Sequence, residues 1–367
     1  MGLSITADKG RRRVAWLVPI AVAGLVVAGA AVESSGASAA PRLTPRTTAQ
    51  LLSAVATTST EALSGKITES AALGLPDLPG EAQSASLSWQ SFLTGTHSVR
   101  VWADGPAKQR LAVIGELSEA DIVHNGRDLW TYTSDMNTAS HTVLPARSRR
   151  HDVSGQRVPV LTPAAATARI LKQVSPSTSV TLGPNVTVAD ESAYTLVIAP
   201  RDARSTIRRI TIAIDSVHFV PLQVAVFGAA AAPAIKVGFS DISFDRPPAS
   251  TFDFHIPSGA TVTKHPFAGG VAEVHGPIPP RGIAQRPIAA RPRVIGSGWT
   301  SVLELHNADA IGPAGGLFRQ LTVPVGSSGM RLLHTALINA VVTGDGRAFI
   351  GLVRPAALEH IASTTTG

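Results

Sequence analysis

Histidine is the side chain of this sequence best suited to metal ligation or acid–base catalysis, because cysteine is absent. No two histidines stand two or four residues apart, the spacings that place two imidazoles on one face of a strand or helix. The sequence therefore predicts no metal site, and without cysteine it has no disulfide, zinc ribbon or thiol nucleophile. The eleven histidines are His97, His124, His141, His151, His218, His255, His265, His275, His306, His334 and His360.

Motifs for nucleophilic or phosphoryl-transfer chemistry are also missing. The chain contains no Gly-x-Ser-x-Gly, no serine three residues before a lysine, and no glycine loop that leads into Lys-Ser or Lys-Thr. Gly296-Ser297-Gly298 lacks the third glycine of a dinucleotide fingerprint. We expect a non-enzymatic protein with no cofactor. An exported hydrolase that uses a pair of carboxylates stays open as an alternative, because Asp and Glu are plentiful.

The charge of the chain does not point to nucleic acid. Lys and Arg number 32 against 25 Asp and Glu, a formal charge of +7, but only 16% of residues are charged. The basic residues are spread along the chain, without a clustered stripe or an aromatic stacking platform. We therefore expect no nucleic-acid partner.

Residues 1–40 have the composition of a targeting segment. Arg11, Arg12 and Arg13 precede residues 14–32, which carry no charge. Ala37-Ser38-Ala39 fits the small-x-small rule of a signal peptidase site, whereas the uncharged stretch approaches the length that crosses a bilayer. Residues 1–40 are predicted to be a signal peptide or a single N-terminal transmembrane anchor. Both place the rest of the chain outside the cytoplasm, secreted or held at the cytoplasmic membrane.

Two helices are expected in the next part of the chain, each opened by Thr-Pro. Thr44 can cap a helix over residues 45–60, with Pro45 tolerated where the backbone N–H has no partner. The second helix, over residues 163–175, follows Leu161-Thr162-Pro163 and places its apolar residues on one face.

Short strands fill the remainder of residues 41–263. They come in two series at a spacing near ten residues, with Asn125-Gly126-Arg127 as a tight turn in the first series. About ten such strands exceed what a flat open sheet holds, which favours a mainly β (α+β) fold: a sandwich or a strongly curled antiparallel barrel.

The amino-acid composition changes over residues 264–296. They are rich in proline, glycine and arginine and are predicted to be a linker. Residues 297–367 are expected to form a small C-terminal strand-helix-hairpin segment. In it, residues 299–305 are predicted to be a strand, residues 331–342 and 348–353 to be the two arms of a hairpin, and Pro355 to start a last helix.

With no catalytic motif left, the candidate site is apolar. Strand residues that alternate with polar ones would line the concave face of a barrel, and aromatic residues before the second strand could cover its mouth. Whether that face is filled core or an open cavity depends on the size of the barrel. The candidates are Trp89, Phe92, Leu93, Val99, Val101, Leu111, Val113, Ile122, Leu196, Ile198, Ile210, Ile212, Leu222 and Val224.

Several short segments of strand and turn residues resemble those of a known family. They are the Thr44-Pro45 start, Leu63-Ser64-Gly65, residues 99–110 and 125–130, residues 215–224, and Phe252-Asp253-Phe254-His255-Ile256-Pro257. Residues 41–263 thereby resemble the LolA-like and RseB-like periplasmic proteins, in an actinobacterial variant. The resemblance implies a half-open antiparallel barrel with a helical lid over an apolar cavity.

The same resemblance implies two functions for an exported protein of the cell envelope. One is to carry or chaperone lipids or the acyl chains of lipoproteins. The other is to act as an RseB-like sensor that regulates an anti-sigma factor, a membrane protein, through protein–protein contact. An anchored chain cannot ferry cargo far, and a barrel followed by a smaller C-terminal segment is closer to the RseB-like arrangement.

Overall fold

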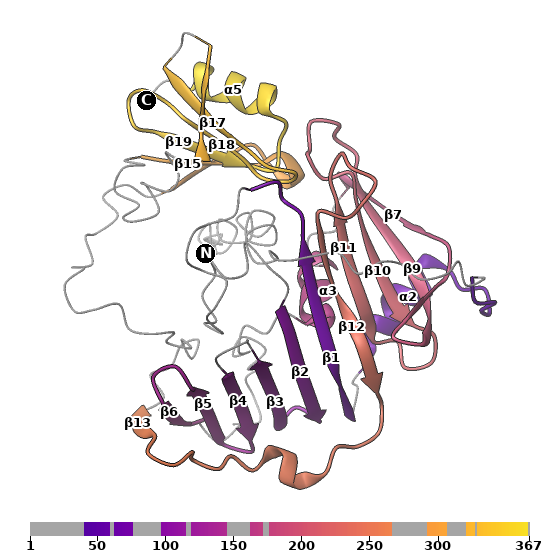
Figure 1. Cartoon of the computed structure of the whole chain (residues 1–367). Coiled ribbons are helices and arrows are strands. Elements are labelled where there is room, and N and C mark those ends of the chain that lie inside the picture. Colours follow the sequence, from indigo (N-terminus) through magenta and orange to yellow (C-terminus); the bar gives the residue numbers. More distant parts are fainter. Residues whose placement is uncertain are drawn as a thin grey trace, which may run out of the picture.

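The computed structural model describes residues 40–58, 62–75, 97–114, 119–144, 162–171, 176–265, 292–306, 321–326 and 329–365. Within them the chain is mostly β, with two open sheets and a few short helices (Figure 1), which confirms the expected mainly β class. The predicted signal or anchor segment lies outside these residues except for Ala40. In the part that is described, no helix combines the length and the apolar composition needed to cross a membrane.

The larger sheet contains thirteen of the described strands, in the order β13-β6-β5-β4-β3-β2-β1-β12-β11-β10-β9-β7, with β8 beside β9. Its described path ends at β13 and β7, so the sheet is open and not a closed barrel. The strands are β1 (Ala62–Ala71), β2 (His97–Asp104), β3 (Lys108–Ile114), β4 (Glu119–Asn125), β5 (Asp128–Thr133), β6 (Thr138–Val143), β7 (Thr178–Leu182), β8 (Val186–Val188), β9 (Glu191–Pro200), β10 (Arg209–Asp215), β11 (Pro221–Phe227), β12 (Ile235–Ser243) and β13 (Thr261–His265).

The two predicted strand series meet at β1 and β12. Their antiparallel register runs from Ser64 opposite Ser243 to Ala71 opposite Ile235. From β2 to β6 and from β9 to β12, strands that follow one another in the chain are antiparallel neighbours in the sheet, so each series contains an antiparallel meander. The turn between β4 and β5 is the predicted one, and Gly126 adopts a φ of 63° there, which glycine reaches without a steric cost.

One edge of the sheet departs from the expected antiparallel pattern. Strand β13 pairs with β6 in parallel, with Thr261 opposite Thr138. After β12 the chain passes through the short helix η3 (Ala249–Phe252), which contacts β3 and β4, before it reaches β6. Because the chain crosses the sheet instead of turning back on itself, β13 enters in the same direction as β6.

Both expected helices are present, and the first is shorter than predicted; residues 172–175 of the second prediction lie outside the described residues. Helix α2 (Thr48–Thr57) is capped by Thr47 and not by Thr44, because Thr47 and Gln50 form a capping box: the Gln50 backbone N–H donates to Thr47 Oγ1 at 3.2 Å, and the Thr47 N–H donates to Gln50 Oε1 at 2.7 Å. Helix α3 (Pro163–Leu171) begins at its proline as predicted. Leu51 of α2 and Ile170 of α3 are buried in the core of the larger sheet.

The smaller sheet has the order β14-β15-β19-β18-β17-β16 and packs on helix α5 (Pro355–Thr364). Strand β14 lies inside residues 264–296, the predicted linker. Its pairing with β15 makes it part of the smaller sheet. The strands are β14 (Arg293–Ile295), β15 (Val302–Leu305), β16 (Val323–Val325), β17 (Met330–His334), β18 (Asn339–Val342) and β19 (Ala348–Gly351), and the short helix η4 (Gly298–Thr300) precedes β15.

Two expectations for the C-terminal segment need correction. The arm predicted over residues 331–342 is two strands, because the Thr335 hydroxyl accepts hydrogen bonds from the N–H groups of Leu337 and Ile338 and closes a turn between β17 and β18. The strand predicted over residues 299–305 begins only at Val302. The N-terminal part of that stretch is the helix η4, whose Trp299 is directed at the larger sheet.

The two sheets are joined by hydrogen bonds and a shared core. The Ala336 N–H donates to the carbonyl of Leu73 at 2.9 Å, just beyond the end of β1. Trp299 Nε1 donates to Thr178 Oγ1 of β7 at 2.8 Å. Leu337 belongs to the same apolar cluster as the strands of the larger sheet. The C-terminal sheet is therefore held against one end of the larger sheet by main-chain and side-chain contacts.

We expect Gly228→Ala to weaken this junction. A Cβ atom at Gly228 would stand 2.5 Å from the carbonyl oxygen of Ala336, too close for either backbone to stay in place. Such overpacking should lower the free energy of unfolding by about 1–3 kcal/mol in urea denaturation. Gly344→Ala is the matched control, because nothing lies within 4 Å of its Cβ position. An equal loss of stability in both variants would argue against a tight junction at Gly228.

Candidate functional site

One face of the larger sheet is apolar across both strand series. We call it the inner face and define it by the strand residues whose side chains pack in one cluster with Leu51 of α2 and Ile170 of α3. On β1 to β4 it contains a row in which Ile67, Val99, Val113 and Ala120 are successive cross-strand partners. Side chains of such partners lie on the same side of a sheet, so the row is continuous.

A second row runs beside the first. Val101, Leu111 and Ile122 are successive partners on β2, β3 and β4. Gly65 of β1 is the partner of Val101, and Phe239 of β12 packs against it: a Cβ atom at Gly65 would lie 3.0 Å from the Phe239 ring. Aromatic cover of this glycine fills the place that a side chain would take at the centre of the inner face.

The second strand series continues the same face. Leu196, Ile212 and Val224 are successive partners on β9, β10 and β11, and Val224 is paired with Val237 of β12. Ile198 and Ile210 form the neighbouring pair, and Leu222 belongs to the same cluster. Most of these side chains have no exposed surface, which is typical of packed core.

The structure thus brings the eleven strand candidates described here to one face. Val99 is half-buried, and the other ten are buried. Their role in binding a ligand stays a prediction. Trp89, Phe92 and Leu93 lie outside the described residues. The placed candidates are Val99, Val101, Leu111, Val113, Ile122, Leu196, Ile198, Ile210, Ile212, Leu222 and Val224.

The described helices pack against one half of the inner face. Helix α3 contacts β11 and β12, and α2 contacts β7. In Figure 1 both helices lie against the strands β7 and β9–β12 and away from β3–β6. The sheet therefore has a helix-covered half, formed by β7 and β9–β12, and a second half formed by β1–β5.

The outer face of β3–β5 is covered by the chain segment that leads from β12 to β13. Phe252 is 1% exposed, and Phe254 stacks on Trp130 with ring centroids 4.9 Å apart. Below the segment, the Arg110 guanidinium donates to both carboxylate oxygens of Asp121, at 3.1 and 2.7 Å, and to the Thr251 carbonyl. Burial raises the pKa of Asp121, and the bonds from Arg110 act in the opposite direction.

Glu69 of β1 is an acidic side chain on the inner face. Its cross-strand partners are His97 of β2 and Val237 of β12, and it alternates with Ile67 and Ala71. The residue is only 4% exposed, and among the described residues nothing donates a hydrogen bond to its Oε1. Desolvation by burial raises the pKa of Glu69 from 4.5 to about 8, so its side chain is mostly a neutral carboxylic acid at pH 7.

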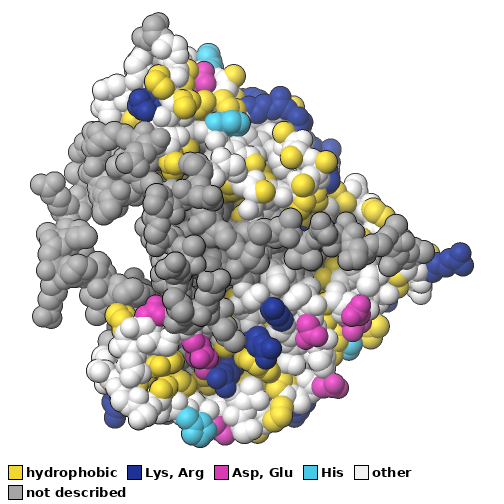
Figure 2. Space-filling model, viewed as in Figure 1, with side chains coloured by type: hydrophobic (Ala, Val, Ile, Leu, Met, Phe, Trp, Pro, Cys, Tyr) yellow, Lys and Arg dark blue, Asp and Glu magenta, His cyan; other side chains and the backbone are white. Residues whose placement is uncertain are grey.

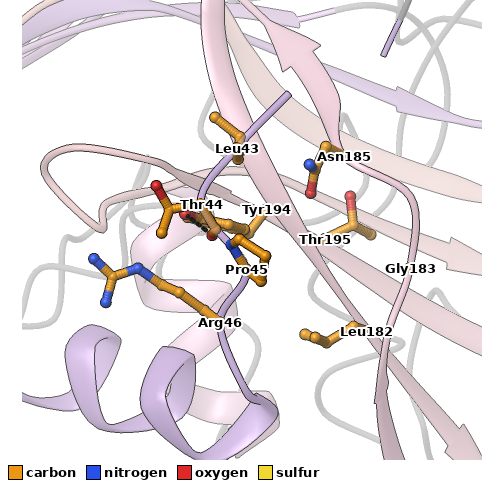
Figure 3. Close-up of a pocket in the computed structure, with 9 residues that line it drawn as sticks. All are labelled: Leu43, Thr44, Pro45, Arg46, Leu182, Gly183, Asn185, Tyr194 and Thr195. Carbon is orange, nitrogen blue, oxygen red and sulfur yellow. Dashed lines mark hydrogen bonds between the residues drawn. The ribbon is translucent and has the colours of Figure 1, made fainter. Parts of the chain in front are cut away.

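A small pocket lies where the N-terminal segment meets the sheet edge (Figure 3). Leu43, Pro45 and Leu182 line its apolar part, and Asn185 and Thr195 line its polar part. The segment is fixed there because Tyr194 OH donates to the Thr44 carbonyl at 2.8 Å and Asn185 Nδ2 donates to the Pro41 carbonyl at 3.0 Å. The cavity measures about 150 Å³, below the 300–1,000 Å³ of ordinary small-molecule sites, so it is not the place for an acyl chain.

Charged side chains give no second candidate site among the described residues. No group of three or more His, Asp and Glu there is arranged to hold a metal ion. Figure 2 shows that Lys and Arg side chains on the visible face stand in separate groups among acidic, polar and apolar ones. In the smaller sheet, Glu304 is buried but lies near Arg347 and Arg293, at 3.4 and 3.6 Å, which assigns it to the packing of that sheet.

Sequence reasoning did not single out Glu69. The signal was present, because Glu69 takes the place of an apolar residue in the alternation Ile67, Glu69, Ala71 and Leu73. What the sequence lacked was the knowledge that this alternation faces the core and that β2 and β12 flank it on both sides.

Comparisons with known proteins show a likeness of fold. No family model matches the sequence, and no curated protein does so. The structure is similar to the MucA/MucB complex of Pseudomonas aeruginosa, at 13% identity and a TM-score of 0.40, over 86% of this chain and 96% of that chain. It is similar to a LolA superfamily protein from Nitrosomonas europaea, at 14% identity and a TM-score of 0.21, over 57% of this chain and 99% of that chain.

An uncharacterised conserved protein from Thermus thermophilus is similar too, at 12% identity and a TM-score of 0.33, over 59% of this chain and 98% of that chain. The similar structures include a LolA superfamily protein, and residues 41–263 of this sequence resemble that group. At identities this low the likeness concerns the fold.

We expect Glu69→Gln to remove a pH dependence of stability. Between pH 4.5 and about 8 the folded chain keeps the Glu69 proton that the unfolded chain has released, so the free energy of unfolding falls as the pH rises through this window. The loss is on the order of 1 kcal/mol per pH unit and ends above the folded pKa. Urea denaturation from pH 5 to 9 measures it.

The difference between the variant and the wild type isolates Glu69 from the other titrating groups. It should grow with pH in favour of Glu69→Gln and level off near pH 8. Parallel pH profiles of the two proteins would show that Glu69 is ionised or solvated in the folded state.

Proposed function

We propose that this chain is a non-enzymatic binding protein of the cell envelope, LolA-like or RseB-like in type, whose inner face holds acyl chains of lipids or lipoproteins. The observation that carries the proposal is the continuity of the apolar rows across β1–β4 and β9–β12. The Val, Ile and Leu side chains of these rows offer a ligand the exclusion of water.

The energetics suit a carrier or chaperone. Moving an acyl chain from water to an apolar site is favourable by about 0.8 kcal/mol per CH₂ group, less what stabilises the unliganded protein. A chain of ordinary length then binds tightly without a single directed hydrogen bond. This agrees with a sequence that has no nucleophile motif, no cysteine and no cofactor motif.

The half formed by β1–β5 is the better place for the acyl chain. In the other half, α3 packs on β11 and β12, and Ile210 and Ile212 have no exposed surface. Val99, which is only half-buried, lies in the β1–β4 row, so a ligand there meets a side chain that is not already enclosed. We assign the lid role to the two helices, of which α3 packs on β11 and β12, next to β1.

The proposed location follows from residues 1–40. Their basic start, uncharged stretch and small residues support export, with either cleavage or retention as a single anchor. The mature chain then works on the outer side of the cytoplasmic membrane, where lipids and acylated proteins are available.

A regulatory role through protein contact is the second candidate, and the C-terminal sheet favours it. That sheet is fixed to the larger one through Leu73, Thr178 and Ala336, so it offers a second surface in a set position relative to the inner face. An RseB-like sensor would read an acyl chain on the inner face and contact an anti-sigma factor with this second surface.

We expect Val99→Trp to block acyl binding without unfolding the chain. A large ring at this half-buried position would occupy the row between Ile67 and Val113 and should weaken binding of a fluorescent fatty-acyl probe at least about 10-fold, equivalent to ~1.4 kcal/mol. Arg100→Trp is the matched control, because Arg100 is the next residue of β2 and is exposed on the outer face. Equal probe binding by both variants would contradict an acyl site on this row.

Ile212→Trp should behave differently. Ile212 has no exposed surface and packs in the helix-covered half, so the added ring should cost about 1–3 kcal/mol of stability. Thermal denaturation with and without the acyl probe separates the two effects. Full stability of Ile212→Trp together with lost probe binding would move the acyl site to the β9–β12 half.

A further inference from the structure

Glu69 is a buried carboxyl among the apolar side chains of the inner face. A buried carboxyl oxygen without a partner costs free energy, because it gives up its hydrogen bonds with water and receives none in return. Here the side chain is 4% exposed and, in the described part of the chain, its Oε1 has no hydrogen-bond partner. A ligand group that supplies the missing hydrogen bond would recover this cost, so the carboxyl marks a polar point in an apolar site.

The protonation state decides which ligand group fits. Burial raises the pKa of Glu69 to about 8, so at neutral pH the group has one O–H donor and a carbonyl acceptor. The oxygen of an ester or amide carbonyl accepts from the O–H, and a secondary amide can also donate its N–H to the carboxyl. A cationic head group would instead require the ionised carboxylate, which burial disfavours.

The position on β1 sets the direction of the ligand. Glu69 follows Ile67, and from Ile67 the first apolar row leads across β2, β3 and β4. On the other side, Ala72 and Leu73 leave the sheet toward Ala336 of the C-terminal sheet. A carbonyl at Glu69 therefore places the head of the ligand near the junction of the two sheets and its tail along the row.

We propose that Glu69 holds the polar end of an acyl ligand by a hydrogen bond to its ester or amide carbonyl, and so selects acyl compounds over plain hydrocarbons. The proposal rests on the acyl-binding function proposed above and adds a specificity-determining residue to it. The C-terminal sheet then lies next to the ligand's head group, where a change of ligand is most readily sensed.

The test compares four probes of the same chain length on the full-length chain freed of bound lipid: dodecane, methyl dodecanoate, N-methyldodecanamide and dodecylammonium. Native mass spectrometry and competition with a fluorescent probe give the dissociation constants at pH 7. The variants are Glu69→Leu, which keeps an apolar side chain without hydrogen bonds, and Glu69→Gln, whose amide still donates to a carbonyl. Thr68→Val, on the opposite face of β1, is the matched control.

For Glu69→Leu we expect the ester and the amide to bind about 10-fold more weakly than to the wild type, while dodecane binds as well as before. Glu69→Gln should keep most of the affinity for both carbonyl probes, and Thr68→Val should change nothing. Melting temperatures measured alongside show whether each variant is folded.

Two results would overturn the inference while leaving the proposed function intact. One is that all probes bind the wild type and the carbonyl probes lose no more affinity than dodecane in Glu69→Leu. The other is that dodecylammonium binds the wild type most tightly and loses this advantage in Glu69→Gln, which would show an ionised carboxylate. If dodecane and the acyl probes all fail to bind the wild type, the acyl-binding function itself is refuted, and the role of Glu69 with it.

Discussion

The pairing of β1 with β12 is the interaction on which the rest of the structure depends. It joins strands that are far apart in the sequence, and its register places Glu69 opposite Val237 and Ile67 opposite Phe239. The pairing contains one irregularity, a register shift between Lys66 and Ile67. Beyond it side chains alternate between the two faces, so a further shift of one residue would turn the apolar set of one series to the opposite face from that of the other. The register therefore makes two separate meanders share one inner face.

The two halves of the sheet are packed by different parts of the chain. Helix α3 packs on β11 and β12, so Ile210, Ile212 and their neighbours are conventional core. The outer face of β3–β5 is closed by Phe252 and Phe254 and by the Arg110–Asp121 pair. In the proposed function, the inner side of β1–β5 is the part of the sheet that takes the ligand.

A carboxyl such as Glu69 has two opposite consequences for such a protein. Its burial lowers stability as the pH approaches its raised pKa, yet a neutral acid is the form that can donate a hydrogen bond inside an apolar site. If Glu69 holds the ligand as proposed, stability and recognition depend on the same group. Leu73, four residues after Glu69, accepts the hydrogen bond from Ala336 that links the two sheets.

The sequence by itself determined the local structure: the alternation that makes the strands, the Thr162-Pro163 start of α3, the turn at Gly126, and the apolar residues that share a face. The cap at Thr47 is also local, because Thr47 and Gln50 stand at the spacing of a capping box. Tertiary structure alone decided which strands become neighbours, the parallel entry of β13, and the burial of Glu69. The physical reason is that periodicity fixes the side to which a residue points. Its neighbours and its burial depend on contacts between distant parts of the chain.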